Sequence, residues 1–282
     1  MQTSVASKIL RVGHSPDPDD AFMFYALSKG AVSLPGYEIE HVIEDIQSLN
    51  RRAMRSELDV TAISAAVYPQ VAENYWILAS GASVGRNYGP KVIANHKLSR
   101  QELNGKRIAV PGLQTTAYLL LKIFLNDFTP VEMSFEKIIS AVQTSQVDAG
   151  LIIHEGQLNY SNFGLKCCLD LGESWYDKYQ LPIPLGLDIV RKDLGVATAK
   201  AVQKAIKESI VFARGKESQA LDYALQFGRG ISKDTAKIFC GMYVNEDTED
   251  LGASGEQALL LLFQEGAALG LFQAPQKLEI IR

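Results

Sequence analysis

The sequence has few cysteines, no excess of basic residues and no long apolar run, and each absence excludes a class of protein. The three cysteines, Cys167, Cys168 and Cys240, are odd in number and lack metal-ligand spacing, so neither a disulfide framework nor a zinc site is expected. The net charge is −4 without a Lys or Arg cluster, whereas nucleic-acid binding needs a concentrated basic face. No apolar run approaches the roughly 18 residues of a membrane span. We therefore expect neither a nucleic acid nor a membrane as a partner.

Several cofactor and catalytic motifs are absent as well. No G-x-G-x-x-G follows a strand, and there is no P-loop and no G-x-S-x-G elbow, so neither a nucleotide cofactor nor serine hydrolase chemistry is expected. Asp17, Asp19 and Asp20 could suggest a metal site, but capping of a helix that begins near Asp17 accounts for all three, and no metal is expected. The N-terminus has no charged segment followed by an apolar one, so we expect no signal peptide and a cytoplasmic location.

The pattern along the chain predicts an α/β protein with two lobes. A length of 282 residues suits two compact units. Short β-like runs alternate with amphipathic helices, which is typical of βαβ units and a parallel sheet. The pattern begins at residues 8–13 and restarts at residues 106–110, and after Val196 it is helical without visible chemistry, as expected for packing on the first lobe. The other expected strands are residues 37–43, 59–63, 76–79, 91–94, 131–134, 149–153 and 187–190.

Polar residues follow four of the expected strands. Ligands of open parallel sheets bind outside the carboxyl ends of the strands. If the two lobes face each other, these four strand ends converge on one cleft, which we expect to bind a small anionic molecule. The four ends are His14-Ser15, Ser64, Gln114-Thr115-Thr116 and His154-Glu155.

Each candidate side chain has a functional and a structural interpretation. Thr115 and Thr116 open a helix, whose unpaired N–H groups suit an anion, but a threonine there also serves as a plain cap. His154 follows a buried run and could act as a general base or acid, or hold a loop carbonyl. Glu155 could orient the histidine, although a solvent-facing position is favoured. Arg86, in a glycine-rich segment, could pair with a substrate carboxylate or lie on the surface.

A series of short motifs occurs in a fixed order between residues 8 and 190. Each is weak alone, but their order and spacing resemble those of the 1,4-dihydroxy-6-naphthoate synthase family, lyases of the futalosine route to menaquinone. The chain departs from the usual family motif at Asp17 and Asp19, where Cys and Asn are typical. These two carboxylates either only cap the helix or contact the ligand and change the substrate. The motifs are Ser15-Pro16-x-Pro18-x-Asp20 with Phe22 and Phe24-Tyr25-Ala26-Leu27, Glu44-Asp45, Leu49-Asn50-Arg51, Ser64-Ala65-Ala66-x-Tyr68, Gly85-Arg86 with Gly89-Pro90, Val110-Pro111-Gly112 with Thr115-Thr116-Ala117-Tyr118, Ala149-Gly150-Leu151-Ile152-Ile153-His154-Glu155 and Leu181-Pro182-x-Pro184-Leu185-Gly186.

The resemblance implies a type II periplasmic-binding-protein-like fold with a ligand cleft between two lobes. Residues 1–92 and 188–282 would form a discontinuous first lobe and residues 93–187 an inserted second lobe, with crossings near 90–94 and 186–190. The implied reaction converts cyclic dehypoxanthine futalosine, a carboxylated bicycle attached to a sugar, to 1,4-dihydroxy-6-naphthoate without a metal or organic cofactor. His154 would be the base. The expected substrate-binding residues are Ser15, Ser64, Arg86, Thr115, Thr116 and Glu155.

Three rival functions fit parts of the same pattern. A solute-binding protein without catalysis could share the fold, but it would need export. Chorismate dehydratase is the sister enzyme, and the Ile-Ile-His-Glu stretch favours the synthase over it. A ligand-sensing regulatory domain usually carries a DNA-binding module, and no helix-turn-helix segment is visible. The sequence predicts no oligomeric state.

Overall fold

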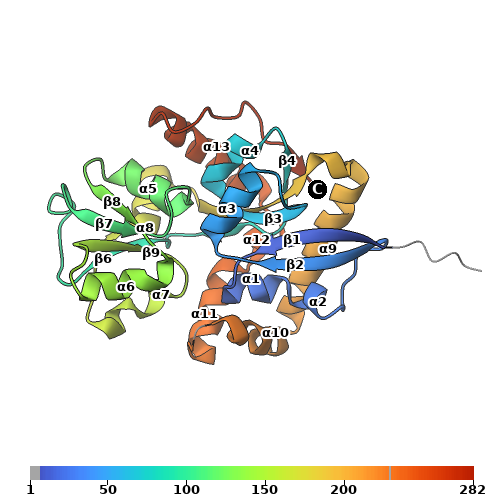
Figure 1. Ribbon diagram of the computed structural model, residues 1–282, viewed down its shortest axis with the longest axis horizontal. Coiled ribbons are helices and arrows are strands. Elements are labelled where there is room, and N and C mark those ends of the chain that lie inside the picture. Colours follow the sequence, from blue (N-terminus) through green and yellow to red (C-terminus); the bar gives the residue numbers. More distant parts are fainter. Residues whose placement is uncertain (1–6, 229) are drawn as a thin grey trace, which may run out of the picture.

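Two β-sheets, each covered by helices, form two lobes that lie side by side (Figure 1). The computed structural model describes residues 7–228 and 230–282, so residues 1–6, on which the expected absence of a signal peptide partly rests, lie outside the described residues. The chain between β6 and α8 forms one lobe, and the N-terminal strands and the C-terminal helices together form the other. This architecture confirms the expected two-lobed α/β fold.

The first sheet has the order β12-β4-β11-β3-β1-β2, and β5 also pairs with β11. β1 runs parallel to β2 and β3, whereas β11 runs antiparallel to β3, β4 and β5. All five residues of β3 are buried, as expected for a strand covered on both faces. The strands are β1 (Lys8–His14), β2 (Tyr37–Ile43), β3 (Val60–Ser64), β4 (Tyr75–Leu78), β5 (Ser83–Gly85), β11 (Ile183–Arg191) and β12 (Ile280–Ile281).

The second sheet has the order β10-β6-β9-β7-β8. β7 runs parallel to β8 and β9, and β6 runs antiparallel to β9 and β10. Cys167 and Cys168 are half-buried neighbours on β10. The strands are β6 (Lys91–Ala94), β7 (Arg107–Val110), β8 (Thr129–Glu132), β9 (Ala149–Ile152) and β10 (Lys166–Asp170).

The helices after residue 195 return to the first lobe, as their apolar stripes predict. Ile206 and Ile210 of α9 belong to the same buried cluster as Leu10 and Val12 of β1. The helices are α1 (Pro18–Met23), α2 (Tyr25–Ser28), α3 (Ile46–Met54), α4 (Tyr68–Val71), α5 (Thr116–Phe124), α6 (Phe135–Gln143), α7 (Gly156–Asn159), α8 (Leu171–Tyr179), α9 (Val196–Gly215), α10 (Glu217–Ala224), α11 (Lys233–Tyr243), α12 (Glu246–Glu249) and α13 (Gly252–Ala268).

The chain passes between the sheets twice, after β5 and before β11. The expected strand 187–190 is too short, because β11 begins at Ile183 and its first residues pair with β5. The whole of β11 therefore lies in the first sheet, and β6 lies entirely in the second. The division into residues 1–92 with 188–282 and residues 93–187 stays our proposal for the lobes.

The first passage touches α8 where Gly172 meets the segment before β6. A Cβ atom added to Gly172 would lie 2.0 Å from the carbonyl carbon of Tyr88 and 2.3 Å from the amide nitrogen of Gly89. These are backbone atoms, which cannot rotate away as a side chain can. Glycine is therefore required here so that the first passage can lie against α8.

We expect Gly172→Ala to lower the free energy of unfolding by about 2 kcal/mol or more, because the added methyl group would force the backbone of the first passage away from α8. Urea unfolding followed by circular dichroism measures this change. Gly241→Ala is the control, because that helical glycine has no atom within 4 Å of an added Cβ. The control should be neutral or stabilising by up to about 1 kcal/mol. Equal stability of Gly172→Ala and wild type would contradict the close approach.

Candidate functional site

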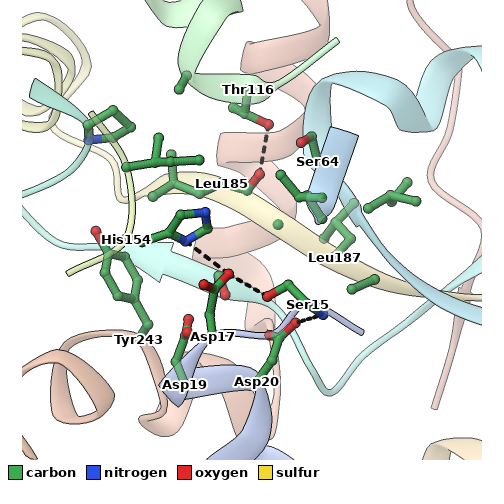
Figure 2. Close-up of a pocket in the computed structure, with 18 of the residues that line it drawn as sticks. Ser15, Asp17, Asp19, Asp20, Ser64, Thr116, His154, Leu185, Leu187 and Tyr243 are labelled. Carbon is green, nitrogen blue, oxygen red and sulfur yellow. Dashed lines mark hydrogen bonds and ion pairs between the residues drawn. The ribbon is translucent and has the colours of Figure 1, made fainter. Parts of the chain in front are cut away.

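A pocket between the lobes collects residues from four strand ends (Figure 2). Ser15 follows β1, Ser64 ends β3, Thr116 begins α5 and His154 follows β9. All four line a cleft that encloses about 720 Å³, part of it open to solvent. The expected convergence of these strand ends on one cleft is therefore confirmed.

The lining of this pocket is largely apolar, and its charged residues are acidic. Asp17, Asp19 and Asp20 lie on one side, and no Lys or Arg is among the described lining residues. Negative charge on a ligand would therefore be held by neutral donors such as hydroxyl and backbone N–H groups. The remaining lining residues are Ile46, Ala62, Ile63, Gly81, Ser83, Pro90, Ala117, Ile153, Gln157, Leu185, Gly186, Leu187, Phe239 and Tyr243.

His154 stands directly after the buried strand β9, and its ring lies between Phe135 and Asp17. The backbone of His154 has φ = 59°, in the left-handed region that few non-glycine residues adopt. The ring makes an edge contact with Phe135 at a centroid distance of 4.7 Å. Its Nδ1 lies 3.1 Å from Oδ2 of Asp17. The histidine is thus held from two sides at the wall of the pocket.

The expectation that the Asp17 side chain caps the first helix is wrong. Asp17 occupies the backbone position before α1, but its carboxylate makes no cap hydrogen bond. Instead, Oδ2 accepts a hydrogen bond from Oγ of Ser15 at 2.6 Å and faces His154. Pro18 at the first helical position lacks an N–H, which leaves one fewer donor for a capping side chain.

Asp19 and Asp20 lie in the first turn of α1, as predicted, but both are buried. Asp20 accepts a hydrogen bond from the Ser15 amide at 2.6 Å, and burial raises the pKa of this carboxyl to about 6. Burial, with the neighbouring Asp20 and Asp17, raises the pKa of Asp19 well above its usual value. Oδ1 of Asp19 has no hydrogen-bond partner. Asp19 therefore tends to be protonated and uncharged beside the pocket.

Ser64 is fixed by Asn50 of α3. The Asn50 side chain accepts from the Ser64 amide at 2.8 Å and donates to Oγ of Ser64 at 3.0 Å. The carboxylate of Asp45 caps α3 by accepting from the amides of Gln47 and Ser48, as its sequence position predicts. A capped α3 thus orients Asn50, and Asn50 orients the Ser64 hydroxyl at the pocket.

The two threonines have different roles. Thr115 caps α5 by accepting from the Tyr118 amide at 3.2 Å, and it does not line the pocket. Thr116 lines the pocket and bridges the lobes, because its hydroxyl donates to the Leu185 carbonyl at 2.7 Å and accepts from the Ala66 amide at 3.1 Å. Thr115 thus fits the structural interpretation as a cap, whereas anion binding at Thr116 stays a prediction.

We expect Thr116→Val to raise KM and to lower the free energy of unfolding by about 1–3 kcal/mol. The isosteric valine leaves the Leu185 carbonyl and the Ala66 amide without their partner. Steady-state kinetics and urea unfolding measure the two effects. Thr116→Ser retains the hydroxyl and is the control. Identical behaviour of the valine and serine variants would show that the hydroxyl contributes nothing.

Arg86 and Glu155 do not line the pocket. Arg86 donates from Nε and Nη2 to the two carboxylate oxygens of Asp247, at 2.7 and 2.6 Å. It thus pairs with a carboxylate, but with one from α12 of its own chain. Glu155 is only 8% exposed, so the favoured solvent-facing position is wrong.

The helices after residue 195 contribute to the pocket, contrary to the expectation that they carry no chemistry. Phe239 and Tyr243 of α11 line it, and the Tyr243 hydroxyl donates to Oε1 of Gln157 at 3.0 Å. Gln157 belongs to α7 of the other lobe. No sequence signal distinguishes these aromatics from ordinary core positions of an amphipathic helix.

Within residues 7–228 and 230–282, no group of three or more His, Cys, Asp or Glu side chains is placed to hold a metal ion. No helix in the described part of the chain has the length and apolarity needed to cross a bilayer.

The amino-acid sequence of the chain matches a known protein family and two curated enzymes. The profile of a family described as menaquinone biosynthesis matches residues 10–268. A 1,4-dihydroxy-6-naphthoate synthase of Thermus thermophilus is 41% identical over 93% of this chain and 95% of its own. The enzyme of the same name from Streptomyces coelicolor is 36% identical over 96% of this chain and 97% of its own.

Solved structures agree with the fold. The crystal structure of protein AF1704 from Archaeoglobus fulgidus has a TM-score of 0.91 and 50% identity, covering 95% of this chain and 100% of that one. The alkanesulfonate-binding protein SsuA from Xanthomonas axonopodis has a TM-score of 0.71 at 16% identity, covering 97% of each chain, which shows the periplasmic-binding-protein-like fold alone. From the profile match and the two curated relatives, we conclude that the chain belongs to the menaquinone biosynthesis family that includes the 1,4-dihydroxy-6-naphthoate synthases.

Proposed function

We propose that this protein is a carbon–carbon lyase that converts cyclic dehypoxanthine futalosine to 1,4-dihydroxy-6-naphthoate in the cytoplasm. The observation that carries the proposal is the position of His154 at the wall of the interlobe pocket. One ring nitrogen faces Asp17, and Figure 2 shows the other on the side of the pocket. A histidine so placed can accept a proton from a bound substrate.

The chemistry follows from this arrangement. His154 accepts a proton from the substrate, and the electron pair that held it drives cleavage of the carbon–carbon bond to the sugar portion. The fragment that receives the electron pair of the broken bond takes up the proton from His154, and the ring system becomes aromatic. Aromatisation supplies driving force, and the proposed steps use no metal or organic cofactor. The cleft orients the substrate and excludes water, and neutral donors of the lining, such as the Ser64 hydroxyl, hold the substrate carboxylate.

The direct test is to incubate the purified full-length chain with cyclic dehypoxanthine futalosine and to follow product by liquid chromatography. We expect release of 1,4-dihydroxy-6-naphthoate. A parallel reaction with chorismate tests the sister enzyme, chorismate dehydratase, and calorimetry with the futalosine derivative tests simple binding. Consumption of chorismate alone, or binding without product, would overturn the proposal in favour of the dehydratase or of a solute-binding protein.

A further inference from the structure

We propose that Asp17 is the positioning residue of His154, holding the proton on Nδ1 so that Nε2 is the basic atom. This inference rests on the proposed function, in which His154 is the base. The carboxylate of Asp17 comes from the first lobe and the imidazole from the second, so the pair is assembled across the pocket.

The geometry of Asp17 supports this role. Its side chain is only 2% exposed, and Oδ2 lies 3.1 Å from Nδ1 of His154. The same oxygen accepts the hydroxyl proton of Ser15 at 2.6 Å, which fixes the carboxylate from a second direction. Since the side chain takes no part in capping α1, its orientation serves these contacts. A contact between such polar groups is electrostatically stronger in a buried site than in water.

The neighbouring carboxylates cannot replace Asp17. Asp20 is engaged with the Ser15 amide at 2.6 Å, and no ion pair joins Asp19 or Asp20 to the His154 ring. Asp19, whose pKa burial raises well above its usual value, is expected to be uncharged. Of the three carboxylates on this side of the pocket, Asp17 is the one placed on the imidazole.

The chemical consequence follows from hydrogen-bond complementarity. A neutral imidazole has one N–H and one lone pair, and a carboxylate can only accept. Contact with Asp17 therefore places the hydrogen on Nδ1 and leaves the lone pair on Nε2. After proton transfer both nitrogens carry hydrogen, and the adjacent carboxylate stabilises the positive charge. In serine-protease triads, replacing the orienting carboxylate by its amide lowers kcat by about 10⁴-fold.

The first test is Asp17→Asn, which keeps the size of the side chain but can donate an N–H to Nδ1 and so reverse the tautomer. We expect kcat to fall by about 10²–10³-fold with little change in KM, because a general base contributes about 10²–10⁴-fold. Asp127→Asn is the matched control, since it makes the same change at an exposed aspartate outside the pocket. Added to His154→Gln, Asp17→Asn should cost no further activity if it acts through the histidine.

The second test does not depend on turnover. The chain has four histidines, so ¹⁵N-imidazole NMR resolves His154 once His154→Gln identifies its signal. In its neutral form, wild-type His154 should carry hydrogen on Nδ1, and the Asp17→Asn variant should carry it on Nε2. If the asparagine variant does not fold, Asp17→Ser, which removes the carboxylate, should also release the wild-type tautomer preference.

The outcomes separate this proposal from the proposed function. An unchanged tautomer, or a kcat within about threefold of wild type, would overturn the role of Asp17 even if the enzyme releases naphthoate. A tautomer that changes as expected in a protein that releases no naphthoate would leave the positioning contact intact and overturn the proposed reaction instead.

Discussion

His154→Gln is expected to lower kcat for naphthoate release by about 10³-fold, the middle of the range for a general acid or base. Glutamine has a similar reach but cannot accept a proton at neutral pH. KM should change little, because the apolar and hydroxyl groups of the lining remain. Steady-state kinetics with product quantified by chromatography measures the change.

The control for this prediction is His96→Gln. His96 lies on an exposed loop after β6, outside the pocket. It should retain wild-type kcat, and both variants should unfold at the wild-type temperature. Activity of His154→Gln within about threefold of wild type would remove the histidine as base and leave Asp17 and Asp19 as the groups to substitute next.

Asp188→Asn should flatten the dependence of stability on pH. Burial, with nearby Asp20, raises the pKa of Asp188 well above its usual value, and Oδ2 has no hydrogen-bond partner. The folded protein therefore keeps this proton at pH values where the unfolded chain has lost it. The stabilisation is fully present below the unfolded pKa of about 3.9 and is lost as the pH rises toward the folded pKa, by up to about 1.4 kcal/mol per pH unit.

Asparagine at position 188 is uncharged at every pH and lacks this dependence. Urea unfolding between pH 4 and neutrality should show a smaller loss of stability for the variant than for wild type. Asp127→Asn, a change at an exposed aspartate, should keep the wild-type slope. Parallel curves for wild type and Asp188→Asn would contradict a raised pKa at this carboxyl.

The local sequence pattern predicted the helices and strands well, but it predicted the hydrogen-bond and ion-pair partners of the side chains poorly. Residues 37–43 and 91–94 are strands with the expected bounds, because their apolar patterns end at clear turns. The position of Asp17 before Pro18 indicated a cap, but its partner follows a strand far along the chain in the other lobe. Likewise, Arg86 shows no sequence link to Asp247.

The pocket could be predicted only in part for the same reason. Four lining residues could be predicted from the ends of the expected strands, because the topology of parallel sheets alone brings such ends together. They are Ser15, Ser64, Thr116 and His154. Tyr243 could not be predicted in this way, because it reaches the pocket only through the packing of α11 on the first lobe. A pocket residue that comes from a distant helix cannot be recognised from the sequence around the strand ends.

The closed arrangement of the lobes depends partly on a small set of polar contacts. Nε2 of Gln47 donates to Oε1 of Gln114 at 2.8 Å, and the bonds of Thr116 and Tyr243 also cross between the lobes. Each such bond contributes about 0.5–1.5 kcal/mol, in addition to the apolar side chains of both lobes that share one buried cluster. Under the proposed function, product would leave between the lobes, and the rate at which these contacts open would limit turnover, however fast the proton transfer is.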